Sequence, residues 1–193
     1  MDEIRLLSWL KADDFRMECL ATASRLQLKN WCIAAGFLRN LSWDKLHGYT
    51  QSTMLEDIDL IYFNPDKLEK DYDRELESKL PTFKSGPKWS VKNQARMNFR
   101  NRHPEYSDLI DAMGFWPETC TSVGVFLSSR SLKLISAYGF QDLFDLKICK
   151  SPMTTLNEKQ LFDRIRNKNW LQKWPLLTID FPSPPSLQRQ EKY

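Results

Sequence analysis

EDIDLIYFNP, residues 56–65, is the stretch from which the rest of this sequence is best interpreted. In an extended strand, alternate side chains point to opposite faces, so Asp57 and Asp59 share one face while Ile58 and Leu60 share the other. Two carboxylates this close repel each other unless a cation lies between them. A hard divalent cation with oxygen ligands, Mg²⁺ above all, is therefore the natural candidate for this position.

The preceding segment predicts a strand, a tight turn and a helix. WCIAAG (31–36) is a short apolar run typical of a buried strand, and FLRNLSWDKLHG (37–48) predicts a helix that ends at Gly48. Gly36 at such a turn lets backbone amides approach a ligand, and the N-terminus of a helix favours phosphate. With the acidic pair on the next strand, this combination indicates phosphoryl or nucleotidyl transfer.

The remaining elements follow from hydrophobic periodicity, caps and turn residues. They are two helices over residues 2–28, a helix over 65–80 with Pro65 in its first turn, a strand over 88–93, a hairpin over 121–139, and a last helix that a capping box of Thr155 and Glu158 opens and that runs to about Lys173.

This order of elements predicts an α/β (α+β) fold, a short mixed β-sheet flanked by helices, with the N- and C-terminal helices packed on it. We expect one domain over residues 1–179. Its parts are a helical pair (1–28), a sheet core (30–139) and a C-terminal helical part (140–179). The tail, 180–193, is rich in proline and polar residues and is expected to be disordered.

Composition narrows the class of protein. The chain has 193 residues, 41% hydrophobic and 27% charged, which is typical of a globular protein. A net charge of +3 is too small to indicate nucleic-acid binding by itself. No apolar run approaches the ~18 residues of a membrane span, and no signal peptide is expected. The four cysteines are widely spaced, without a CxxC pair, which favours free thiols in a reducing compartment and a cytoplasmic location.

Several blocks of the sequence resemble a known family. AAGFLRN, WDKLHG, EDIDLIYF, WSVKNQARM, WPETCTSVGV and YGFQDLF are similar, in this order, to blocks of the small bacterial proteins of the nucleotidyltransferase family. That group lies within the fold superfamily of DNA polymerase beta, the tRNA CCA-adding enzymes and the aminoglycoside nucleotidyltransferases. The resemblance covers roughly residues 30–175 and implies the nucleotidyltransferase fold.

The resemblance also implies roles for individual residues. Gly36 matches the superfamily's strand-to-helix glycine, and Asp57 and Asp59 match its catalytic, metal-binding acidic pair, which takes Mg²⁺ or Mn²⁺. Phe37 stands where the superfamily has a small residue or a serine that touches the triphosphate, and by this position it counts among the candidate nucleotide-binding residues. Arg39 and Asn40 are the candidates to replace that contact, and Arg39 is preferred because a guanidinium pairs bidentately with phosphate.

Many superfamily members add a third carboxylate on the following strand, where this chain has Asn93, a neutral oxygen donor. Asp142 is then one candidate for the catalytic base, with a helix N-cap as the alternative. Basic residues recur every four positions from Lys84 to Arg100, a spacing that a strand over 88–93 would interrupt. Lys92 and Arg96 remain the candidates to face the nucleotide.

These observations favour a metal-dependent transferase that moves a nucleoside monophosphate from an NTP to an unknown acceptor, which can be a small molecule, an RNA or a protein. One alternative is a catalytically silent nucleotide- or RNA-binding module of the same fold, which Phe37 and Asn93 favour. A less favoured alternative is an Asp-x-Asp sugar transferase, since such enzymes are usually longer. The acceptor and the oligomeric state stay open at this point.

Overall fold

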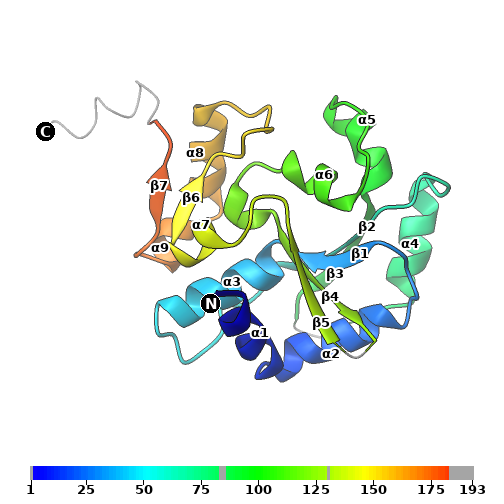
Figure 1. The fold of residues 1–193 in the computed structure, drawn as a ribbon, viewed down its shortest axis with the longest axis horizontal. Coiled ribbons are helices and arrows are strands. Elements are labelled where there is room, and N and C mark those ends of the chain that lie inside the picture. The colour runs from blue at the N-terminus through cyan, green and yellow to red at the C-terminus, as the bar shows by residue number, and fades with distance from the viewer. Residues whose placement is uncertain (1, 83–85, 130, 183–193) are drawn as a thin grey trace, which may run out of the picture.

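The computed structural model describes residues 2–82, 86–129 and 131–182 (Figure 1). Helices and strands alternate along the first part of the chain, and short elements follow. In order they are α1 (Asp2–Lys11), α2 (Asp14–Ser24), β1 (Trp31–Ala34), α3 (Gly36–Leu46), β2 (Asp57–Tyr62), α4 (Lys70–Ser78), β3 (Lys88–Asn93), the 3₁₀ turn η1 (Gln94–Arg96), α5 (Met97–Asn101), α6 (Leu109–Gly114), the 3₁₀ turn η2 (Thr119–Thr121), β4 (Val123–Ser128), β5 (Ser131–Ser136), α7 (Gln141–Phe144), β6 (Lys147–Cys149), α8 (Glu158–Asn167), α9 (Trp170–Lys173) and β7 (Thr178–Asp180).

The central sheet has five strands in the order β3-β2-β1-β4-β5. β2 and β3 run parallel, while β1 is antiparallel to both β2 and β4, and β4 and β5 form an antiparallel hairpin. The sheet is therefore mixed. Helices flank it, as Figure 1 shows, so the predicted fold class is confirmed.

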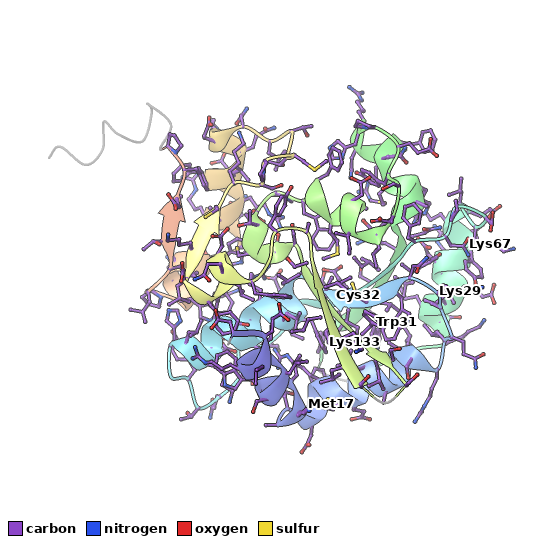
Figure 2. All side chains as sticks on the ribbon, viewed as in Figure 1. Met17, Lys29, Trp31, Cys32, Lys67 and Lys133 are labelled. Carbon is purple, nitrogen blue, oxygen red and sulfur yellow. The ribbon has the colours of Figure 1, made fainter. Side chains whose placement is uncertain are left out.

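Alternation along the strands gives each face of the sheet its own core. Trp31 and Ile33 of β1 point into the larger core, together with buried side chains of α1, α2, α3 and α4. Cys32 and Ala34 point the other way and pack with Leu109 and other side chains of α6. Figure 2 labels Trp31 and Cys32, neighbours in sequence that belong to different cores. We call the second face the α6 face, and the site described below lies on it.

Two helix boundaries differ from the predicted ones. The helix expected from Pro65 begins at Lys70 instead, because the Asn64 side chain accepts a hydrogen bond from Asp66 N at 2.9 Å and holds a turn there. The long helix expected up to Lys173 is divided into α8 and α9 at Asn169, whose φ of 53° is left-handed.

The N-cap of α8 also differs from the prediction. Asn157 is the cap, and Gln160 completes its capping box, so the predicted box of Thr155 and Glu158 is wrong by two residues. The register matters for function, because it fixes which residues of α8 face the sheet.

The C-terminal part contains strands that were not predicted. β6 and β7 form a parallel two-stranded sheet in which Ile148 pairs with Ile179. Asp180, expected in the tail, is the last residue of β7, and residues 183–193 of that predicted tail lie outside the described residues. Among the helices that the structure describes, none is long and apolar enough to cross a membrane.

Candidate functional site

The acidic pair opens onto a hollow at one end of the sheet. β1 runs antiparallel to β2, and Ile33 pairs with Leu60, so the end of β1 lies beside Asp57 and Asp59. The hollow has a volume of about 240 Å³. We call it the charged hollow, and its polar lining consists of Gly36, Arg39, Asn40, Glu56, Asp57, Asp59, Lys92, Arg164, Lys168 and Lys173.

The turn from β1 into α3 forms one wall of the charged hollow. Ala35 has a φ of 54°, a conformation that costs a non-glycine residue free energy and that clusters at functional sites. The Ala35 amide donates a hydrogen bond to Val123 O at 2.9 Å, and the Ala35 carbonyl accepts one from Arg39 N at 2.9 Å. A Cβ on Gly36 would lie 3.3 Å from Arg39 Nη2, closer than most such contacts. Gly36 therefore leaves the room that the Arg39 guanidinium occupies.

Arg39 is a buried cation, and no carboxylate of the described residues forms an ion pair with it. It is 8% exposed, and its guanidinium carbon lies 4.5 Å from the centre of the Trp170 ring. Nη2 donates to Asn40 Oδ1 at 3.0 Å, whereas the buried Nε has no partner among the described residues. Burial lowers the pKa of this guanidinium. An anion entering the hollow would supply the missing charge and the missing acceptor.

The two carboxylates differ in burial: Asp57 is exposed and Asp59 is partly buried. Burial, and secondarily the charge of Asp57, raises the pKa of Asp59, against the opposing effects of Lys92 and of a hydrogen bond with Ser90. Lys92 Nζ itself donates to Ser90 Oγ at 2.7 Å. The pair offers two hard oxygen donors, and the described residues contain no cluster of three or more acidic, His or Cys ligands. Such a donor set fits a Mg²⁺ ion that takes its other ligands from water and phosphate.

The opposite wall comes from α8 and α9, more than 100 residues further along the chain. Lys168 Nζ lies 2.5 Å and Lys173 Nζ 3.5 Å from the Glu56 carboxylate. Arg164 Nε donates to Glu118 Oε1 at 2.7 Å, and Glu118 is fully buried. Five cations and three carboxylates thus line the charged hollow, so it suits an anionic ligand.

The residues from α8 and α9 were absent from the sequence-based site. The spacing of Arg164 and Lys168 by four residues was the available signal, because it places them on one face of a helix. Nothing in the local sequence says that this face meets the acidic pair. Glu118, which precedes η2, forms a buried ion pair with Arg164 and thereby ties α8 to this part of the chain.

Phe37 does not belong to the site, so its predicted contact with the triphosphate is wrong. Its side chain is 1% exposed and packs in the larger core, where the guanidinium of Arg16 lies 5.5 Å from its ring. Gly36, Arg39 and Asn40 line the charged hollow and Phe37 does not; Phe37 and Arg39, two residues apart on α3, lie on nearly opposite sides of the helix.

Asn93 is not placed to be a metal ligand either. The parallel register pairs Asp59 with Ser90, so Lys92 is on the face of the acidic pair and Asn93 points to the opposite face. Its Oδ1 accepts from the amides of Asn64 and Ala95 at 3.0 and 3.1 Å. Its Nδ2 donates to the carbonyls of Asn64 and Lys67 at 2.7 and 2.6 Å. The predicted third ligand is therefore a buried structural amide.

Arg96 and Asp142 also lie away from the charged hollow. Arg96 forms an ion pair with Asp73 of α4, which is buried, so its expected contact with nucleotide is wrong. Asp142 Oδ2 accepts a hydrogen bond from Thr119 Oγ1 at 2.6 Å and does not line the hollow. Of the two basic candidates, only Lys92 reaches the acidic pair.

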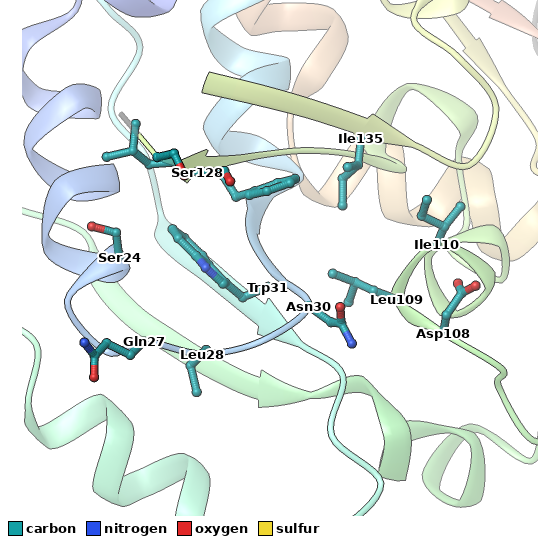
Figure 3. Close-up of a pocket in the computed structure, with 13 residues that line it drawn as sticks. Ser24, Gln27, Leu28, Asn30, Trp31, Asp108, Leu109, Ile110, Ser128 and Ile135 are labelled. Atoms are coloured by element: carbon teal, nitrogen blue, oxygen red, sulfur yellow. The ribbon is translucent and has the colours of Figure 1, made fainter. Parts of the chain in front are cut away.

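Two further hollows bear on the choice of site. One, of about 230 Å³, adjoins the charged hollow on the α6 face and shares Asp59 and Lys92 with it; we call it the second hollow. A larger one, about 630 Å³, lies between the end of α2, the start of α6 and the β4–β5 hairpin, around Trp31 (Figure 3). None of the sequence-predicted site residues lines it.

Comparison with known proteins gives a consistent result. The sequence profile of a nucleotidyltransferase family matches residues 21–179. A protein whose NMR structure reveals a CCA-adding enzyme head domain is 31% identical, with a TM-score of 0.78 over 92% of this chain and 95% of that one. No curated protein matches the chain.

Two larger enzymes share the fold at low identity. A CCA-adding enzyme in complex with ATP is 14% identical, with a TM-score of 0.53 over 90% of this chain and 41% of that one. A tRNA-processing enzyme in an apo form is 16% identical, with a TM-score of 0.50 over 84% and 42%. The chain matches about two fifths of each of these enzymes.

Proposed function

The chain belongs to the nucleotidyltransferase family, and from that premise we propose that it transfers a nucleoside monophosphate from an NTP to an acceptor, with Mg²⁺ or Mn²⁺ as cofactor. One observation carries the proposal. A pair of carboxylates on one strand face and the buried guanidinium of Arg39, which has no carboxylate partner among the described residues, line the same cation-rich hollow. That combination matches a metal-bound triphosphate, which brings both the cation that the acids need and the anion that the guanidinium needs.

In this proposal each wall of the charged hollow has its own task. Asp57 and Asp59 hold the cation, which when bound neutralises phosphate charge and polarises the reacting phosphoryl group. Arg39 and the N-terminus of α3 bind phosphate oxygens. Lys168 and Lys173 face the departing pyrophosphate. With a hydroxyl acceptor, its oxygen forms the new bond to the α-phosphorus, pyrophosphate leaves with the electrons of the broken bond, and the hydroxyl proton passes to solvent.

Phe37 and Asn93 were the two residues that favoured a catalytically silent binding module, and their positions no longer support that alternative. Phe37 is a core residue, and Asn93 is a structural amide on the opposite face of the sheet, so neither substitution alters the charged hollow. The transferase proposal stands on residues that do line the hollow.

A binding experiment tests the proposal. Each of the four NTPs is added to the protein with Mg²⁺ or with EDTA, and the melting temperature and pyrophosphate release are measured. A ligand at 100 times its Kd stabilises the folded state by about 2.7 kcal/mol, so at least one NTP is expected to raise the melting temperature with Mg²⁺ and much less with EDTA. If all four leave the melting temperature unchanged in the presence of Mg²⁺ and Mn²⁺, the proposal is wrong.

Substitution of Glu56 is expected to strengthen NTP binding, whereas substitutions of most other site residues weaken it. The Glu56 carboxylate forms ion pairs with Lys168 and Lys173, and the hydrogen bond from Lys168 holds the pKa of Glu56 below its usual range. A triphosphate must displace this carboxylate to reach the two ammonium groups. Glu56→Gln is therefore expected to tighten NTP binding, by up to about fivefold for an exposed ion pair of up to ~1 kcal/mol.

Isothermal titration with an NTP and Mg²⁺ measures this effect. Glu75→Gln is the matched control, because Glu75 pairs with Lys79 on α4 and does not line the hollow, and its affinity is expected to equal that of the parent. A weaker affinity for Glu56→Gln than for Glu75→Gln would show that Glu56 supports the nucleotide rather than competes with it.

A further inference from the structure

The second hollow continues the charged hollow along the α6 face. The two share Ala35, Asp59, Lys92 and Arg164. The two hollows are therefore adjacent, and a phosphate beside Asp59 lies at the border of the second hollow. Together the two hollows have the size of an ordinary small-molecule site, roughly 300–1,000 Å³.

The lining changes character from one hollow to the next. The charged hollow is lined by five cations and three carboxylates, whereas the second hollow adds apolar and amide side chains. The additional residues are Ile61, Gln94, Met97, Asn101, Trp116, Pro117 and Thr121. Ile61 and Met97 are buried, and the indole of Trp116 is half-buried, so the hollow offers apolar surface and an aromatic ring. Such a surface suits a flat heterocycle rather than a phosphate.

Gln94 is the polar group that distinguishes this hollow. It is 5% exposed, its Oε1 has no hydrogen-bond partner among the described residues, and its Nε2 lies 3.5 Å from Lys92 O, the outer limit of a hydrogen bond. Because Oε1 is not among the buried atoms that lack a partner, solvent reaches it, and the Gln94 amide presents an open acceptor and a nearly open donor to the second hollow. An amide can bind the edge of a base that presents both a donor and an acceptor.

Asn93 explains why Gln94 is held in this place. The Asn93 side chain caps η1 through its bond with Ala95 N, and its other bonds fix it to the segment that follows β2. The chain direction at the end of β3 is thereby set, and Gln94, the next residue, lines the second hollow while Asn93 points to the opposite face. The amide predicted as a metal ligand thus positions the residue beside it.

We propose that the second hollow binds the nucleobase of the NTP, with Gln94 contacting its hydrogen-bonding edge and Trp116 its ring face. This rests on the proposed function, because it requires the triphosphate in the charged hollow. Asp59, shared by both hollows, then lies near the α-phosphate, where the bond is exchanged. The acceptor approaches from outside the second hollow, and the choice among NTPs is made within this domain.

The test compares nucleotides with inorganic tripolyphosphate, which has no base. Affinities of ATP, GTP, CTP, UTP and tripolyphosphate are measured with Mg²⁺ for the parent, Gln94→Met and Gln94→Glu. Gln94→Met is expected to weaken the preferred NTP about tenfold and to reduce the differences among NTPs, because it leaves a polar edge of the base unpaired. Tripolyphosphate affinity is expected to change less than twofold.

Two more variants sharpen the result. Trp116→Leu is expected to weaken all four NTPs about tenfold, since stacking tolerates any base. Gln141→Met is the matched control, because Gln141 is exposed on α7, bonds to Asp145 and lines neither hollow. Gln94→Glu keeps the shape and an acceptor but loses the donor, so it is expected to change which NTP binds best even where Gln94→Met lowers stability.

The outcomes separate the two proposals. If tripolyphosphate and the NTPs all fail to bind the parent, the proposed function is wrong. If tripolyphosphate binds but the Gln94 variants keep the affinities and order of the four NTPs, the second hollow is not the base site and serves the acceptor or nothing. Equal losses for tripolyphosphate and NTPs would likewise overturn the assignment, because Gln94 would then act through the charged hollow.

Discussion

Asp59→Asn is expected to reduce kcat/KM for the NTP by about three orders of magnitude. Asp59 is the member of the acidic pair that both hollows share, and its carboxylate is one of two that would hold the cation. A bound cation stabilises the transition state by several kcal/mol, and about 4 kcal/mol corresponds to a factor of about 10³. Pyrophosphate release with Mg²⁺, with water as the acceptor of the nucleoside monophosphate, measures the loss.

Asp66→Asn is the control for this substitution. Asp66 lies in the exposed turn after β2 and lines neither hollow, so its variant is expected to turn over like the parent. Asp57→Asn should resemble Asp59→Asn. Retention of cation-dependent NTP binding by both variants of the pair would show that the cation is held elsewhere.

The raised pKa of Asp59 also predicts that the stability of the folded protein depends on pH. Because burial raises the pKa of Asp59, the folded protein binds this proton more strongly than the unfolded chain does. In the absence of divalent cations, the free energy of unfolding is therefore expected to fall as pH rises from the usual aspartate range through the raised pKa. Asp59→Asn should lose this part of the pH dependence and be more stable than the parent at neutral pH. Urea unfolding in EDTA at a series of pH values measures both effects.

The strand pattern around Asp57 and the turn at Gly36 could be recognised from the sequence because both are local. Alternation places the two acids on one face whatever the strand pairs with. Helical spacing also places Phe37 and Arg39, two residues apart, on nearly opposite sides of α3. The position of the family serine therefore does not predict a phosphate contact for Phe37 in this chain.

The remaining site residues depend on contacts that the local sequence does not encode. Lys168 and Lys173 reach Glu56 across more than 100 residues. α8 ends at Asn167, α9 follows the left-handed Asn169, and the hydrogen bond from Trp174 Nε1 to Asp44 at 2.7 Å ties the end of α9 to α3. Likewise, the register of β3 against β2 decides which of its residues face the acids. A shift of one residue would have exchanged Lys92 for Asn93.

Asp73→Ala is expected to lower the free energy of unfolding by about 3–5 kcal/mol, the largest effect on stability that we predict outside the apolar core. Asp73 is 3% exposed and joins α4 to both strands beneath it. Its Oδ1 accepts from the Tyr62 hydroxyl at 2.6 Å and from Asn93 N at 3.2 Å, and its carboxylate pairs with Arg96. Removing it leaves a buried hydroxyl, a buried amide and a mostly buried guanidinium without their partner.

Asp71→Ala is the matched control, two residues earlier on the same helix. The Asp71 side chain is 86% exposed and pairs with Arg74, so its removal is expected to cost no more than ~0.5 kcal/mol. Urea unfolding at pH 7 compares the two variants. A similar cost for both would mean that the network around Asp73 contributes little. We expect a large cost for Asp73→Ala and an unchanged affinity of the folded variant for tripolyphosphate. That result would mean that Arg96 supports β3 structurally. Phosphate binding would then belong to Arg39 and Lys92, which line the charged hollow.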